Sequence, residues 1–104
     1  MGKLGRELDT DAGYRAARCA MINALGTIKQ ALGDLNRVSY FVKLLGMVNS
    51  MPDFIEQPRV INGASDLLHE LFGEKIAPHA RSAVGMATLP RGNAVEIEMI
   101  VEVR

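Results

Sequence analysis

The order of hydrophobic patterns along the chain limits its fold more than any other feature: helix, strand, helix, strand, strand. In the first pattern apolar residues recur every three or four positions, as one face of an α-helix requires. This stripe consists of Ala17, Met21, Ala24, Ile28, Ala31 and Leu35. Asp9 or Thr10 can cap its start, and Gly33 can end it in a left-handed conformation. We expect a long amphipathic helix, preceded by residues 1–9 as a loop or frayed edge.

A strand and a second helix are predicted next. Residues 38–48 are β-branched, aromatic or aliphatic with little charge, which indicates a mostly buried strand. Pro58 can open a helix that Gly73 stops, and Asn62-Gly63 inside it predicts an irregular first turn. The expected buried face of this helix consists of Val60, Ala64, Leu67, Leu68 and Leu71.

The C-terminal part of the chain predicts a β-hairpin. A strand from about Ser82 to Leu89 leads into a turn at residues 90–93, and residues 94–103 return. In the returning strand, one side is expected to carry Val95, Ile97, Met99, Val101 and Val103, and the other Glu96, Glu98, Ile100 and Glu102. The fold class is therefore α+β, one domain over residues 1–104 with two helices packed on one face of a small sheet. Because the other sheet face is left uncovered, we expect an oligomer.

Charge and cysteine content restrict the partners and the compartment. Twelve basic and twelve acidic side chains give a formal net charge of zero, so nucleic acid is not an expected partner. The single cysteine, Cys19, lies between small residues, and we expect it to be buried and inert in a reducing compartment. No apolar run approaches the roughly 18 to 20 residues of a membrane span, and no secretory signal is evident. We expect a cytoplasmic protein with no membrane partner.

Arg81 is the candidate anchor for a small organic acid. A guanidinium presents a planar fork of donors that matches a carboxylate, and a strand can hold that fork rigidly. The residues alone leave a second interpretation open, in which Arg81 pairs with Glu96 or Glu98 of the adjoining strand. Glu96 is equally compatible with a solvated acidic edge, because alternating polar residues usually face water.

Other chemistry has weak support in the sequence. Ser82 adjoins Arg81, but neither His69 nor His79 stands in a motif that would hold it as a base. With one thiol and no paired ligand spacing we expect no metal site, and with no glycine-rich phosphate loop we expect no cofactor. Asn62 could reach a ligand, although capping of the second helix is the more common duty.

The segment ARSAVGMATLP with the VEIE that follows resembles the C-terminal signature of the RidA/YjgF family, the reactive-intermediate deaminases, also called endoribonuclease L-PSP. The resemblance runs from about residue 5 to residue 103, and NGASDLLHELFGE with HARSAVG is most similar to a branch with a longer N-terminal region. It implies a chorismate mutase-like homotrimer, with sheets around a central barrel and ligand sites between subunits. It also implies hydrolysis of enamines and imines to 2-keto acids and ammonia, without a cofactor.

The resemblance also implies two site residues. Arg81 matches the arginine that grips the substrate carboxylate, and Glu96 matches the glutamate that orients water and shuttles a proton. Ala83 stands where many deaminases have cysteine, and the two strands and glycine-rich loop that begin typical relatives are missing ahead of GKLG. The resemblance is therefore to an N-terminally shortened member, in which a neighbouring chain fills the gap or the pocket is open.

Two functional hypotheses follow from these observations. The first is a deaminase of small 2-imino acids, since imine hydrolysis has a low intrinsic barrier and needs little beyond orientation and one acid/base group. The second is a non-catalytic homotrimeric module that binds a small acid or a protein partner.

Overall fold

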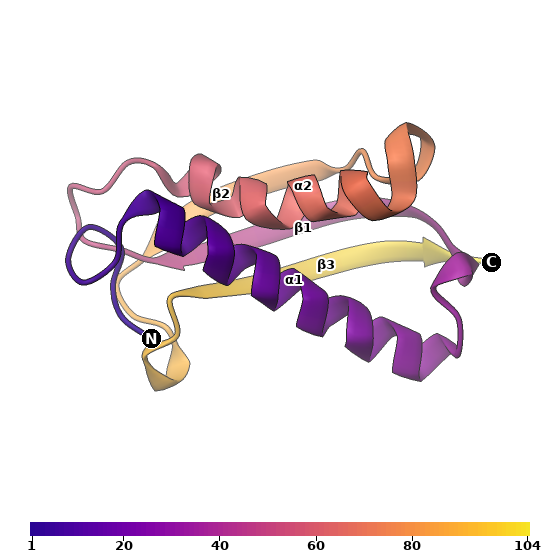
Figure 1. Ribbon diagram of the computed structural model, residues 1–104, viewed down its shortest axis with the longest axis horizontal. Helices are drawn as coiled ribbons and strands as arrows, with labels where there is room; N and C mark the ends of the chain where they lie inside the picture. The colour runs from indigo at the N-terminus through magenta and orange to yellow at the C-terminus, as the bar shows by residue number, and fades with distance from the viewer.

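A computed structural model describes all residues, 1–104, and confirms the predicted order of elements (Figure 1). Short 3₁₀ turns at Leu35–Arg37 and Pro90–Gly92 connect them. The helices and strands are α1 (Thr10–Leu32), β1 (Val38–Asn49), α2 (Gln57–Ile76), β2 (Ala80–Met86) and β3 (Val95–Val103).

The three strands form one mixed sheet in the order β2-β1-β3. β2 runs parallel to β1, whereas β3 runs antiparallel to it. The predicted hairpin between the last two strands is therefore wrong, because β1 lies between them. Parallel neighbours need a crossover connection, and α2 supplies it between β1 and β2. Residues 87–94 then cross the end of β1, so that β3 pairs with its free edge.

Both helices lie on the same side of the sheet, as predicted (Figure 1). α1 packs over β3, and α2 packs over β1 and β2. One apolar cluster fills the space between helices and sheet. Its largest fully buried side chains are Leu4, Met21, Val38, Phe41, Leu44, Val48, Val60, Ile61 and Leu68. Neither helix combines the length and the apolar character that crossing a membrane demands.

The ends of α1 follow the sequence signals. Asp9 is the N-cap, and its side chain accepts a hydrogen bond from the backbone N–H of Ala12 at 2.8 Å. Gly33 ends the helix with φ of 86°, a left-handed conformation that costs glycine little. These local signals act within a few residues of each other, which is why the sequence alone locates both ends.

α2 departs from the prediction at two places. The helix is regular at Asn62-Gly63, where an irregular turn is expected. Gly63 instead allows close helix contact, because a Cβ atom built there would lie 2.1 Å from the backbone oxygen of Tyr14. Leu71, predicted on the buried face, is 59% exposed. It follows the buried Leu67 and Leu68 along the helix but lies outside the contact with α1 and the sheet.

The N-terminal segment is fixed to the sheet rather than frayed. Leu4 is completely buried, and its backbone N–H donates to the Asn49 carbonyl at 2.8 Å. The backbone N–H of Met51 donates in turn to the Leu4 carbonyl at 2.9 Å. The expectation of a frayed edge is wrong because one apolar residue anchors this segment, and a single residue has no periodicity to detect.

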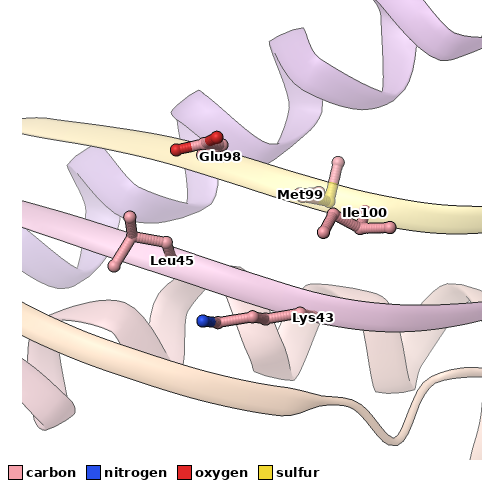
Figure 2. A pocket seen from close by; sticks show the side chains of 5 residues that line it. All are labelled: Lys43, Leu45, Glu98, Met99 and Ile100. Atoms are coloured by element: carbon pink, nitrogen blue, oxygen red, sulfur yellow. The ribbon is translucent and has the colours of Figure 1, made fainter.

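The sheet face opposite the helices carries no covering element. Alternation places Leu45 and Met47 of β1, Val84 of β2 and Ile100 of β3 on it, together with several charged side chains. Val84 is 40% exposed and Ile100 58% exposed. Figure 2 looks onto this face, where Lys43, Leu45, Glu98, Met99 and Ile100 line a shallow cavity of about 110 Å³.

Candidate functional site

Arg81 extends from the edge strand β2 toward α2. Its backbone is in register with Leu44 of β1. Its half-buried guanidinium donates through Nη1 to Asn62 Oδ1 at 2.8 Å and to Ser65 Oγ at 3.3 Å. None of the salt bridges in the molecule involves Arg81. The interpretation in which Arg81 pairs with Glu96 or Glu98 is therefore wrong, since β1 separates the two strands.

Asn62 and Ser65 reach Arg81 because residues three apart share one face of a helix. Asn62 lies inside α2, so the expected capping role is wrong; the N-cap is Glu56, which makes no side-chain capping bond. The spacing of these two polar residues within an apolar helix, together with His79 two residues before Arg81, is the signal that could have identified the cluster.

His79 completes the cluster around Arg81. Its Nε2 lies 3.0 Å from Ser65 Oγ, and its Nδ1 lies 2.6 Å from the Ala77 carbonyl oxygen. A carbonyl only accepts hydrogen bonds, so Nδ1 carries a proton. In the neutral ring Nε2 then accepts the Ser65 hydroxyl proton. Asn62, Ser65, His79 and Arg81 are called the Arg81 cluster below.

The electrostatics of the Arg81 cluster favour an anion. Every hydrogen-bond partner of Arg81 is neutral, and the side chain is partly withdrawn from water. A positive charge without a carboxylate partner attracts a negative ligand more strongly than a charge already paired. The guanidinium fork matches a carboxylate in particular.

Glu96 lies elsewhere in the same chain. It lies on β3, the edge strand opposite β2, and is in register with Met47 of β1. Its strand alternation directs it to the helix-free face, whereas Arg81 faces α2. Glu96 forms no side-chain hydrogen bond or ion pair. One chain alone does not bring the two predicted site residues together.

A groove of about 500 Å³ borders Glu96, between α1 and the start of β3. Cys19 and Asn23 of α1 line its other side. Cys19 is exposed, so the expectation of a buried thiol is wrong. Ala17 and Met21 face the sheet, and a helix rotates about 200° over the two steps from Ala17 to Cys19, so Cys19 points away from the sheet.

The other candidate residues are dispersed. Ser82 precedes Ala83 on β2 and lies on the opposite strand face from Arg81. His69 pairs with Glu74 at 3.3 Å. No three His, Cys, Asp or Glu side chains gather as metal ligands would.

Comparison with known proteins gives a consistent result. Residues 1–102 match the family described as "YjgF/chorismate_mutase-like, putative endoribonuclease". The protein TCP17 of Trypanosoma cruzi is 50% identical over 101 residues, which cover 97% of this chain and 63% of TCP17. This chain therefore spans less than two thirds of that relative.

Two solved structures are similar throughout this chain. Atu1372 of Agrobacterium tumefaciens, a protein of unknown function, superimposes with a TM-score of 0.95 at 48% identity. The match covers 98% of this chain and 65% of Atu1372. A "putative endoribonuclease" of Shewanella oneidensis has a TM-score of 0.93 at 35% identity, over 98% of this chain and 67% of the other.

Proposed function

The chain belongs to the YjgF/chorismate mutase-like family, and from this premise we propose that it hydrolyses small 2-imino acids to 2-keto acids and ammonia. Arg81 binds the ligand carboxylate. The observation that supports this role most is the half-buried guanidinium held by neutral partners, because its charge is left for a ligand. No cofactor enters the proposal.

Glu96 orients the attacking water in this proposal, and it comes from a neighbouring copy. Arg81 and Glu96 lie on opposite edge strands and opposite faces of one sheet, so a single chain cannot place both on one small ligand. A homotrimer with the helix-free sheet faces turned inward would cover the exposed apolar side chains of those faces. The partly exposed Val84 and Ile100 favour such an arrangement. A reducing, cytoplasmic setting also remains a proposal.

Loss of Arg81 tests the proposed reaction. Freshly generated 2-iminobutyrate or 2-iminopropionate is incubated with the protein, and semicarbazide traps the imine that remains. We expect Arg81→Ala to lower kcat/KM about 100-fold or more, since losing a charge-assisted contact to a buried ligand group costs about 2–5 kcal/mol. Arg91→Ala is the matched control, because Arg91 is exposed in the 3₁₀ turn before β3. Absence of acceleration by the native protein, or equal acceleration by Arg81→Ala, would contradict the proposal.

Binding without catalysis is the second candidate, favoured by the separation of Arg81 from Glu96 within one chain. In that case 2-oxobutyrate raises the melting temperature of the native protein but not of Arg81→Ala, while imines decay at the uncatalysed rate. RNA cleavage, suggested by the name of the Shewanella relative, is tested on the same samples. With a net charge of zero we expect none.

A further inference from the structure

Arg81 has an acid/base group beside it within its own chain. Ser65 Oγ bridges Arg81 and His79, at 3.3 Å from Nη1 of the one and 3.0 Å from Nε2 of the other. Glu96 has no such connection, because it requires a second copy of the chain. The nearest proton acceptor to a ligand held by Arg81 is therefore the Ser65–His79 pair.

The geometry of His79 fixes the direction of proton transfer. Nδ1 donates to the Ala77 carbonyl in both protonation states, so only Nε2 gains or loses a proton. When the ring is neutral, Ser65 donates to Nε2 and its oxygen accepts from Arg81. When the ring is protonated, Nε2–H donates to Ser65, and the hydroxyl proton is free to point at a ligand.

We propose that Ser65 and His79 form the proton-transfer pair of the Arg81 site, with Ser65 contacting the ligand and His79 accepting and returning the proton. This inference rests on the proposed function and differs from it in assigning proton transfer to this pair rather than to Glu96. Asn62 holds the guanidinium from the other side, at 2.8 Å.

The chemical step balances without a further reactant. Water adds to the carbon of the protonated imine, and one of its protons passes to Ser65 Oγ while the Ser65 hydroxyl proton moves to His79 Nε2, which leaves a neutral carbinolamine. His79 then returns that proton through Ser65 to the amine nitrogen, the C–N bond breaks and ammonia leaves. The remaining hydroxyl passes its proton to the departing ammonia, so one protonated imine and one water give one 2-keto acid and one ammonium ion.

Few charged groups face His79. From α2, the His69 ring lies 6.5 Å away between centroids, and Glu74 pairs with His69 at 3.3 Å. From the strand that follows, Arg81 lies beyond Ser65. In β1, Lys43 is in register with Ala80 but lines the cavity on the opposite sheet face. No carboxylate pairs with His79, so its proton is free to move with the reaction.

Kinetics of matched variants test the pair. We expect Ser65→Ala and His79→Gln to lower kcat about 100-fold with KM changed less than about threefold, a loss typical of a positioned acid/base group. His79→Gln changes the pH profile of kcat, because the proton acceptor is lost. His69→Gln, which removes the neighbouring histidine, retains the native kcat and pH profile. Circular dichroism melts verify that each variant is folded.

Two results overturn the inference. If Glu96→Gln is inactive while Ser65→Ala and His79→Gln keep the native kcat and pH profile, the pair does not transfer the proton, although the proposed function stands. If the native protein hydrolyses no imine, the proposed function fails, and binding of 2-oxobutyrate then tests the pair. We expect Ser65→Ala to bind 2-oxobutyrate about fivefold more weakly than the native protein, because the hydroxyl beside Arg81 is lost, and His69→Gln to bind it equally well. Equal affinity of Ser65→Ala and the native protein overturns the pair.

Discussion

Arginine side chains in this molecule serve two different purposes, and their partners separate them. Arg18 of α1 binds Glu70 of α2 through its two terminal guanidinium nitrogens, Nη1 at 3.2 Å and Nη2 at 2.8 Å. That charge is neutralised and links two helices on the surface. Arg81 has only neutral partners, although it is partly buried. Arg37 and Arg104 also donate only to backbone carbonyls, but both are exposed. Arg81 is therefore the partly buried arginine whose charge no carboxylate neutralises.

The Arg18–Glu70 pair predicts an acid-sensitive contribution to stability. The hydrogen bonds from Arg18 lower the pKa of Glu70 below its ordinary 4.5. A carboxylate with a depressed folded pKa stabilises the fold above its unfolded pKa, and this contribution is lost as pH falls through the folded value. We expect Glu70→Gln to make the melting temperature less dependent on pH below about pH 4.5 than in the native protein.

Glu102→Gln is the control for that measurement, because Glu102 is exposed on β3 and forms no ion pair. The effect is small because exposed pairs are screened by solvent. A pH profile of Glu70→Gln that coincides with the native one would show that the contact contributes nothing.

The close contact between α1 and α2 depends on the absence of a side chain at Gly63. Gly63 lets the backbone of α1 approach at Tyr14, and the Tyr14 hydroxyl donates to Asp66 one turn along α2 at 2.6 Å. This hydrogen bond raises the pKa of Tyr14, so the neutral phenol is favoured in the folded state. The two helices therefore form one layer over the sheet, and α2 is held where its polar face meets β2.

Substitution of Gly63 tests this close approach. We expect Gly63→Ala to lower the free energy of unfolding by about 3 kcal/mol, because the new methyl group meets backbone that cannot move aside without separating the helices. Chemical denaturation with urea measures the change.

Gly26→Ala provides the opposite case on α1. Nothing lies within 4 Å of a Cβ atom at Gly26, which is exposed inside the helix. Alanine there should raise the free energy of unfolding by about 0.5–1 kcal/mol, because it reduces the entropy of the unfolded chain. If both alanine variants have native stability, the helices are not in the close contact described.

The whole molecule presents one covered and one uncovered sheet face. The uncovered face carries four apolar side chains and several charged ones. The apolar ones are Leu45, Met47, Val84 and Ile100, and the charged ones are Lys43 and the glutamates of β3. The proposed trimer would bury these side chains and bring Arg81 of one copy toward Glu96 of the next. Because a single chain separates these two residues, the proposed activity depends on assembly.

A charge on the uncovered face tests assembly. We expect the native protein to sediment as a trimer and Val84→Glu to weaken association about 100-fold or more, because burying an unpaired carboxylate is costly. Val84 is 40% exposed in the isolated chain, so the fold itself should tolerate the change. Leu71→Glu, on the exposed surface of α2, should remain trimeric. Analytical ultracentrifugation decides, and a native protein that is monomeric at micromolar concentration would contradict the proposal.

The sequence determined the local structure of this protein. The cap at Asp9, the left-handed end at Gly33 and the alternation in Val95–Val103 each depend on residues close together in the chain. The same periodicities placed two helices on one sheet face, since each carries one apolar stripe that must be buried. The sequence also identified the family, through a short signature around Arg81.

Only the tertiary structure decided which segments meet. It put β1 between the last two strands, exposed Cys19, anchored Leu4, and set Asn62, Ser65 and His79 around Arg81. Each of these depends on contacts between residues far apart in the chain. A hydrophobic pattern states which face of an element is buried but not which neighbour covers it, so the surroundings of Arg81 emerged only once the strands and helices were assembled.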